Sequence, residues 1–329
     1  MTTVIRHHDN IYLFIVIEHC KISITMLEVL CVEPIIILDK VSKAFKHNTA
    51  VENASFTIQS GEVVAILGPN GAGKTTTMMM MLGLLHPSKG NVHIFGQHPK
   101  EKFVREKIGA MLQEVSVIDA LKVREVIQLF RSYYHEPLSY GELVHYTGLK
   151  ENELQKRANK LSGGQKRRLG FALAMAGNPD VLFFDEPTVG LDVTSRKIFW
   201  NTVKELKLRG KTIIFTTHYL QEADDVAERV ILFNKGKIIG DGTPKEIKAK
   251  LTKQSISFTS ESPIHHEKLK AIPNVNDVFE KEGRIYVLTG NTDQVLLSLF
   301  AEKIPVKNIE IERGRLEDAF EQLVGEGES

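Results

Sequence analysis

Residues 68 to 76 carry the clearest chemistry in the chain. There Gly68-Pro69-Asn70-Gly71-Ala72-Gly73-Lys74-Thr75-Thr76 contains the pattern G-x-x-x-x-G-K-[ST]. Backbone N–H groups of such a loop converge on phosphate oxygens, and the glycines keep side chains out of their way. The lysine brings a positive charge to the β- and γ-phosphates, and the hydroxyl of Thr75 can ligate Mg²⁺. The spacing therefore predicts a site for a nucleoside triphosphate, with every residue of this loop as a candidate contact.

An apolar run precedes this loop and a helical pattern follows it. Val63–Leu67 is typical of a buried strand, so the loop would join a strand to a helix. The free N–H groups and the positive dipole end of that helix would face the phosphates. A plain glycine turn before an ordinary helix is the simpler alternative, but the buried strand argues against it.

Acidic residues and a histidine end two further apolar runs. Asp185 and Glu186 follow Val181–Phe184, and His218 follows Lys211–Thr217. Strands that are apolar on both faces belong to parallel sheets, and ligands bind at the carboxyl ends of such strands. Asp185 is thus a candidate Mg²⁺ ligand, and Glu186 a candidate for polarising water. A solvated acidic pair and a lone surface histidine are the alternatives, but a shared sheet edge favours a site.

A serine and two glycines open a later helix. The segment Leu161-Ser162-Gly163-Gly164-Gln165 precedes an apolar helical pattern that stops at Gly177-Asn178-Pro179. Ser162 has the chemistry of a helix N-cap, whereas each glycine weakens a first turn by up to about 1 kcal/mol relative to alanine. Because glycines let a ligand approach bare backbone, the segment favours a binding role over a plain serine-capped helix.

Strands and helices must position these residues. Strands are expected over 35–41, 54–58, 90–96 and 108–113, the first two in an antiparallel pair. Helices are expected over 99–107, 121–159, 194–208 and 221–228, with a hairpin over 230–239. The methionine run Met78–Met81 indicates core packing rather than a metal site.

Composition limits the class of protein. The chain has 329 residues, of which 42% are hydrophobic and 25% charged, with a formal net charge of +1. This is typical of a soluble globular protein, and the near-neutral charge gives no electrostatic argument for nucleic-acid binding. No apolar run approaches the roughly 18 residues that span a bilayer, so work at a membrane would need a membrane partner. Cys20 and Cys31 both lie near the N-terminus, so no disulfide framework is expected.

The two ends of the chain differ from its middle, residues 34–242, which hold the candidate chemistry. Residues 1–33 are expected to be an N-terminal extension, either non-native and poorly ordered, with the natural start at Met26, or an added strand or partner-contact segment. Residues 243–329 are expected to form a small α+β domain without a catalytic set, ending in a helix over Leu316–Leu323. The pair His265-His266 in this domain is more typical of a solvated surface than of a metal site.

Together these segments resemble the ATP-binding subunit of an ABC transporter, over about residues 35–240. The resemblance rests on the phosphate loop Gly68–Thr75, on Leu161–Gln165, which matches the signature segment of the family, and on Gln113, Asp185-Glu186, Gly190-Leu191-Asp192 and His218. It implies an α/β P-loop NTPase fold with a mixed sheet core, an antiparallel β subdomain, a helical subdomain and the small C-terminal α+β domain. The tail, with Leu316-Glu317-Asp318-Ala319-Phe320, is similar to ATPases that pair with ABC-2-type permeases, including daunorubicin-resistance exporters.

The resemblance also implies roles for the matching polar residues. Glu186 matches the catalytic carboxylate, His218 the switch histidine, and Gln113 the glutamine that reaches Mg²⁺ and the attacking water. The Mg²⁺ ligands would be Thr75, Gln113 and Asp185. Hydrolysis of ATP with Mg²⁺ as cofactor is the expected reaction.

Nucleotide contacts follow from the same resemblance. Phe45 matches an aromatic that stacks on adenine, although its local pattern alone favours a core or edge-strand residue. Ser162 and Gly164 would contact ATP bound to the other subunit of a head-to-tail dimer, and Asp192 would help to align the opposite site. The full expected set is Phe45, Gly68, Pro69, Asn70, Gly71, Ala72, Gly73, Lys74, Thr75, Thr76, Ser162, Gly163, Gly164, Gln165 and Asp192.

The implied function is an ATPase that drives transport, with export expected, through a separate ABC-2-type permease. It would work at the cytoplasmic face of the membrane as a peripheral homodimer or with a paralogous ABC ATPase. A soluble ABC-type ATPase that remodels a ribosome or a nucleic-acid complex is the alternative. A degenerate regulatory subunit is a third, against which intact Glu186 and His218 argue.

Two departures from the family pattern stand in the sequence. Val193 occupies a position that often holds proline, and Lys166-Arg167-Arg168 is an unusual run after the signature segment. Neither is expected to touch the chemistry.

Overall fold

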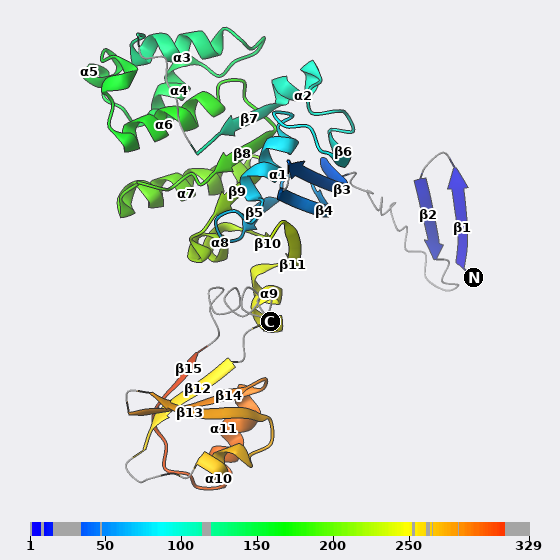
Figure 1. Ribbon diagram of the computed structural model, residues 1–329, viewed down its shortest axis with the longest axis vertical. Coiled ribbons are helices and arrows are strands. Elements are labelled where there is room, and N and C mark those ends of the chain that lie inside the picture. Colours follow the sequence, from blue (N-terminus) through cyan, green and yellow to red (C-terminus); the bar gives the residue numbers. More distant parts are fainter. Residues whose placement is uncertain are drawn as a thin grey trace.

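The computed structural model describes residues 2–7, 10–15, 34–46, 48–113, 120–251, 254–260, 264, 266–281 and 283–312. Most of residues 34–251 form one α/β unit, and residues 254–312 contribute a second (Figure 1). The expected helix over Leu316–Leu323 and the residues Glu114, Cys20, Met26, Cys31 and His265 lie outside the described residues.

A six-stranded sheet forms the centre of the larger unit. Its order is β11 (Lys237–Gly242), β10 (Arg229–Asn234), β5 (Val63–Leu67), β9 (Thr212–Thr217), β8 (Val181–Asp185) and β7 (Ile108–Met111). All neighbours pair in parallel except β11, which is antiparallel to β10. The expected mixed sheet core is therefore confirmed.

Alternate residues of the buried strands belong to different cores. Val64, Ile66 and Phe183 pack with the methionines of α1 (Lys74–Met81), which confirms that the methionine run fills a core. Phe184 and Phe215 face the other side, with α6 (Gly163–Ala174), α7 (Val193–Leu208) and α8 (Leu220–Val226). Strands covered on both faces are expected to be largely apolar, and β5 is apolar throughout.

A three-stranded antiparallel sheet completes the first core. It has the order β4 (Asn48–Ile58), β3 (Ile36–Phe45) and β6 (Lys89–Ile94), with α2 (Lys102–Lys107) following β6 in the chain. Register partners such as Ile36 with Ile58 confirm the expected antiparallel pair.

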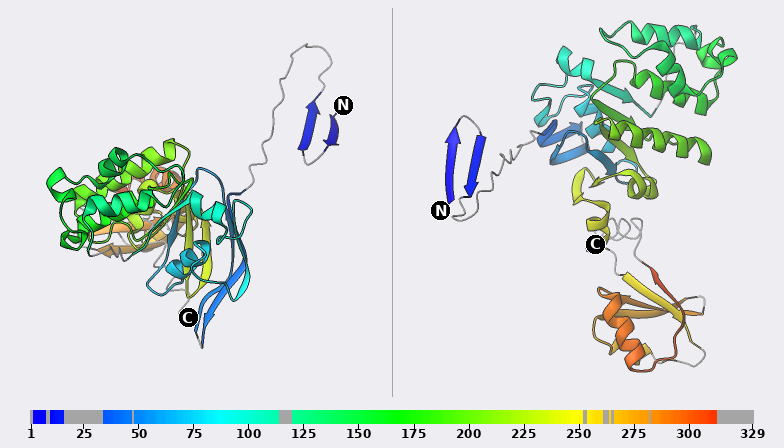
Figure 2. Two further views of the ribbon diagram at one scale, coloured as in Figure 1. Left: turned by 90° about the horizontal axis from the view of Figure 1, so that it is seen from above. Right: turned by 180° about the vertical axis from the view of Figure 1, so that it is seen from behind.

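Helices gather beyond the edge strand β7 (Figures 1 and 2). They are α3 (Val123–Arg131), α4 (Tyr140–Thr147), α5 (Glu151–Leu154), the 3-10 turn η1 (Ala158–Lys160) and α6. This is the expected helical subdomain. Gly109 allows α6 to approach β7 closely, because a Cβ at that position would lie 2.1 Å from the carbonyl oxygen of Ala174.

The C-terminal unit is the expected α+β domain. It follows α9 (Pro244–Leu251) and consists of β12 (Gln254–Thr259), α10 (His266–Lys270), β13 (Val275–Lys281), β14 (Arg284–Thr289), α11 (Thr292–Ala301) and β15 (Lys307–Glu312). Its antiparallel sheet has the order β13-β14-β12-β15, the arrangement of a ferredoxin-like β-α-β-β-α-β fold. Its core, around Phe258, Val287 and Leu299, is separate from the other two.

The N-terminal stretch contains a hairpin of β1 (Thr2–His7) and β2 (Asn10–Ile15).

In the parts of the chain that the structure describes, every helix is too short or too polar to cross a membrane.

Candidate functional site

The candidate residues converge at one edge of the six-stranded sheet. The glycine loop leaves the carboxyl end of β5, Asp185 and Glu186 stand at the carboxyl end of β8, and His218 follows β9 between them. Gln113 lies just beyond β7, the other neighbour of β8. Strand order therefore brings together four segments that are far apart in the chain.

The glycine loop is held against two strands of the protein itself. Gly73 has φ of 104°, and a Cβ there would lie 2.5 Å from the carbonyl oxygen of Ala50 in β4. A Cβ on Gly68 would lie 2.4 Å from the carbonyl oxygen of Phe233 in β10. These glycines are thus required by close packing as well as by the room that a phosphate needs, whereas Gly71 meets nothing within 4 Å.

Lys74 begins α1 and turns back over the loop. Its side chain is buried, and its Nζ donates to the carbonyl oxygens of Gly68 at 2.8 Å and Pro69 at 3.1 Å. Burial lowers the pKa of Lys74, and the nearby carboxylates of Glu186 and Asp185 partly oppose that shift. An ammonium beside the free N–H groups at the start of a helix makes this loop a strong anion site.

Asp185 and Thr75 form an oxygen-rich corner beside that loop. The Thr75 hydroxyl donates to Oδ1 of Asp185 at 3.2 Å, and the Thr216 hydroxyl donates to the same oxygen. Asp185 is buried. A carboxylate and a hydroxyl at this distance are the hard oxygen ligands that Mg²⁺ prefers, so these residues fit the ion.

Glu186 is held on several sides in an unfavourable backbone conformation. Its φ is 47°, in the left-handed region that a residue with a Cβ seldom occupies. Its backbone N–H contacts Thr216, at 3.0 Å from Oγ1 and 3.2 Å from the carbonyl oxygen. Oε1 lies 3.2 Å from Nδ1 of His218, and Oε2 accepts from Nε2 of Gln113 at 3.4 Å. Since an ionised carboxylate only accepts hydrogen bonds, the His218 contact requires its proton on Nδ1.

Arg167 reaches this group from α6, which corrects the expectation that the run after the signature segment does not touch the chemistry. Its Nη1 donates to the backbone oxygen of Glu186, and its Nη2 donates to that of Gln113 at 2.9 Å. The run was visible in the sequence, but the strand-to-helix contact that gives it meaning was not.

Ser162 caps α6 as predicted. Its hydroxyl accepts from the N–H of Gln165 at 3.3 Å, and Oε1 of Gln165 accepts from the Ser162 N–H at 2.9 Å. Ser162 and Gly163 are exposed, and Gly164 lies close enough to Leu191 that its Cβ would be 3.6 Å from that side chain. The start of α6 is therefore a surface-exposed helix N-terminus next to the Gly190–Asp192 turn.

Asp192 and Phe45 are the remaining candidate residues. Asp192 caps α7, and the hydrogen bond from the Ser195 N–H at 3.1 Å lowers its pKa. Phe45 ends β3 with 46% of its surface exposed, and Nζ of Lys43 lies 5.1 Å from its ring centroid. An exposed aromatic beside a cation is not a core residue, so the ring is available to a ligand.

Glu222 is a buried acid that no sequence pattern singles out. Its two carboxylate oxygens accept from the hydroxyls of Thr188 at 2.6 Å and Thr217 at 2.8 Å. Nε of Arg196 lies 3.5 Å from it. This network joins Thr188, just after Glu186, to Thr217, just before His218. Glu222 could not be predicted, because an acid in the first turn of a short helix is usually exposed to solvent.

Comparison with known proteins agrees with this geometry. Residues 51–189 match the family model described as ABC transporter. The Nod factor export ATP-binding protein I of Burkholderia lata is 38% identical over 211 residues, covering 62% of this chain and 69% of that protein. The linearmycin resistance ATP-binding protein of Bacillus subtilis is 32% identical over 307 residues, covering 87% of this chain and 97% of its own length.

A solved structure gives the same result for the fold. A dimeric ATP-binding cassette in a post-hydrolysis state, bound to ADP and Pi, superposes with a TM-score of 0.59 at 29% identity, covering 63% of this chain and 98% of the cassette. The chain therefore belongs to the ABC transporter family, as an ATP-binding subunit with ATPase activity.

Proposed function

We propose that this protein hydrolyses Mg-ATP in a head-to-tail dimer to drive export through a separate ABC-2-type permease. The observation that carries the proposal is the placement of Lys74, Asp185, Glu186, Gln113 and His218 at one sheet edge. ATP would lie along the glycine loop, with its adenine on the exposed ring of Phe45 and its phosphates at Lys74.

The carboxylate of Glu186 would accept a proton from the attacking water. Gln113 and His218 contact its two oxygens and so fix its direction. Lys74 would stabilise negative charge that develops on the γ-phosphate, after exchanging its two carbonyl partners for phosphate oxygens.

Magnesium would be held by Thr75, Asp185 and Gln113. When bound, Mg²⁺ neutralises phosphate charge and orients the phosphoryl group. Asp185 and Thr75 already face each other across 3.2 Å, so little rearrangement of these two side chains is needed.

A second copy, or a paralogous ATPase, would complete each site. Ser162, Gly163, Gly164 and Gln165 begin α6 at the protein surface, where a helix N-terminus with bare glycines suits a phosphate of the facing subunit. Asp192 would help to align that opposite site. The dimeric structure of the similar cassette, with ADP and Pi bound, supports this arrangement.

The partner in the membrane would be a permease, because ABC ATPases work with permease subunits. Two similar proteins bear names that refer to Nod factor export and to linearmycin resistance, which supports export as the direction. The protein would then bind the cytoplasmic side of that permease. The names of these two proteins do not refer to a ribosome or a nucleic acid as the partner.

The Glu186→Gln variant tests the function. It keeps the size and shape of the side chain but replaces one acceptor oxygen with an NH₂ group and cannot accept a proton, so we expect turnover to fall at least about a hundredfold while ATP binding persists. ATP-bound protein should then accumulate as a dimer, measured by light scattering with Mg-ATP. Glu205→Gln, on the exposed face of α7, is the matched control and should leave both properties unchanged. Unaltered turnover in Glu186→Gln would remove this residue from its role, and a monomer at saturating Mg-ATP would argue against the dimer.

A further inference from the structure

Two backbone carbonyls of the site share a single donor side chain. Arg167 donates Nη1 to the oxygen of Glu186 and Nη2 to the oxygen of Gln113. These two residues come from the ends of neighbouring strands, β8 and β7, and both bear side chains that the proposed function uses. A planar guanidinium holds two oxygens through a rigid fork of N–H donors, whereas the donors of a lysine ammonium rotate on a flexible stem.

Glu186 needs such a constraint. A non-glycine residue in the left-handed region costs of order 1–3 kcal/mol and persists only when its surroundings enforce it. Thr216 binds the N–H of Glu186, and Arg167 binds its carbonyl oxygen. The two ends of this strained residue are therefore held by different parts of the fold, β9 and α6.

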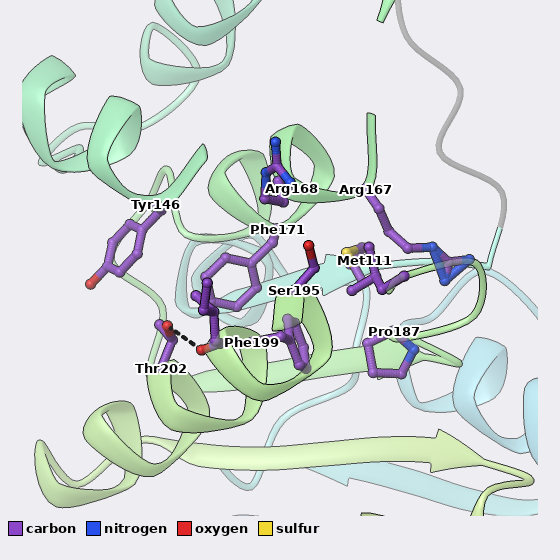
Figure 3. A pocket seen from close by; sticks show the side chains of 11 residues that line it. Met111, Tyr146, Arg167, Arg168, Phe171, Pro187, Ser195, Phe199 and Thr202 are labelled. Carbon is purple, nitrogen blue, oxygen red and sulfur yellow. Dashed lines mark hydrogen bonds between the residues drawn. The ribbon is translucent and has the colours of Figure 1, made fainter. Parts of the chain in front are cut away.

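The guanidinium links the first turns of α6 to the residues that follow β8 and β7. Further along α6, Phe171 packs against Phe184 of β8 with ring centroids 5.5 Å apart. Phe171 also lines a pocket between α6 and α7, together with Arg167, Met111 and Pro187 (Figure 3). From this part of α6, the side chain of Arg167 donates hydrogen bonds to the backbone oxygens of Glu186 and Gln113.

We propose that Arg167 is a positioning residue, which makes the placement of Glu186 and Gln113 depend on the placement of helix α6. This inference rests on the proposed function, in which the start of the same helix contacts the nucleotide of the facing subunit. When the start of α6 closes on the nucleotide of the facing subunit, the helix would therefore shift Glu186 and Gln113 of its own subunit.

The test compares Arg167→Lys with Arg168→Lys in the full-length protein. Arg168 is the next residue of α6 and also donates to a backbone oxygen, that of Thr147 at 2.9 Å, but this oxygen belongs to the helical subdomain. In Figure 3 the two arginines leave α6 in different directions. The pair is therefore matched in charge, helix and type of bond, and differs in the carbonyls held.

We expect Arg167→Lys to lower kcat at least about tenfold while the Kd of a fluorescent ATP analogue stays within about twofold of wild type. Arg168→Lys should keep kcat within about twofold, with the same thermal unfolding midpoint as Arg167→Lys. Hydrogen exchange of the peptide that contains Glu186 should accelerate only in Arg167→Lys. This last readout needs no turnover, so it separates failure of the inference from failure of the proposed function.

Equal kcat and equal exchange in the two variants would overturn the inference. So would a parallel loss of ATP affinity and kcat in Arg167→Lys, which would make the residue part of nucleotide binding instead. If Arg167→Lys unfolds, Arg167→Gln is measured by the same exchange experiment at a temperature where it is folded, and unchanged protection of the Glu186 peptide there would also contradict the proposal.

Discussion

Lys74 is the residue on which nucleotide binding should depend most. Its Nζ lies over the glycine loop, bonded to Gly68 and Pro69. We expect Lys74→Ala to abolish ATP binding at micromolar concentrations, because the loop loses its charge where the β- and γ-phosphates would lie. Isothermal titration of the variant checks this, with Lys89→Ala, at the exposed start of β6, as control. A titration like that of wild type would contradict the assignment of the loop.

The same lysine predicts a dependence of stability on pH. Burial lowers its pKa from the ordinary 10.5 in the native state, so between the lowered value and 10.5 the unfolded chain binds more protons. The free energy of unfolding should therefore rise with pH in that window, and the penalty should be fully present below it. Urea denaturation from neutral pH to 10.5 should show this rise in wild type relative to Lys74→Met. Parallel pH profiles of the two proteins would exclude the effect.

The parts of the site that could be predicted from the sequence are those whose chemistry requires particular residue types. The glycine loop, the paired acids and the helix cap could be found because each needs a specific residue at a specific spacing. Arg167 and Glu222 could not, since their roles come from long-range contacts and nothing in the local pattern separates them from solvated charges. The sequence explained Gly68 and Gly73 only by the room that a phosphate needs. Their close contacts with β10 and β4 could not be predicted, because those strands lie elsewhere in the chain.

Elements bring the active groups together through close packing of α6 on β7. Gly109 makes that packing possible, since a Cβ there would lie 2.1 Å from the Ala174 oxygen and 2.9 Å from Pro179. We expect Gly109→Ala to destabilise the protein by about 1–3 kcal/mol and to lower ATPase activity, because α6 must move away from β7. Urea denaturation and steady-state hydrolysis measure the two effects.

Gly141 provides the control at this scale. It lies in α4, and a Cβ there would meet nothing within 4 Å. Gly141→Ala should therefore be neutral or should stabilise by up to about 1 kcal/mol, as alanine favours the helix. Equal effects of the two glycine substitutions would mean that helix propensity, and not the contact with Ala174, decides the result.

Element types followed from periodicity, and their order in the sheet did not. Runs such as Val63–Leu67 and Val181–Phe184 are apolar throughout, which identifies buried strands. The placement of β9 between β5 and β8 depends on pairing between distant segments, which no local pattern encodes. The family resemblance implied a mixed sheet core, but the order of its strands was not predicted.

The whole molecule contains two units with separate cores, and the boundary between them can be tested. The sequence placed it near residue 243, but Ile247 of α9 is 2% exposed and belongs to the core of the larger unit. We expect truncation after Leu251 to leave ATP affinity and stability near those of the intact chain. Truncation after Gly242 should expose that core and lower the unfolding midpoint. Loss of ATP binding in the longer product would show that the C-terminal unit contributes to the site.

The self-contained bonding of Lys74 has a consequence for the enzymatic cycle. When product departs, the ammonium has two carbonyl oxygens at hand, so it is not left without acceptors. Emptying the loop then incurs a smaller electrostatic penalty than it would for an isolated buried cation. We therefore expect the glycine loop to keep its conformation between release of the product and binding of the next ATP.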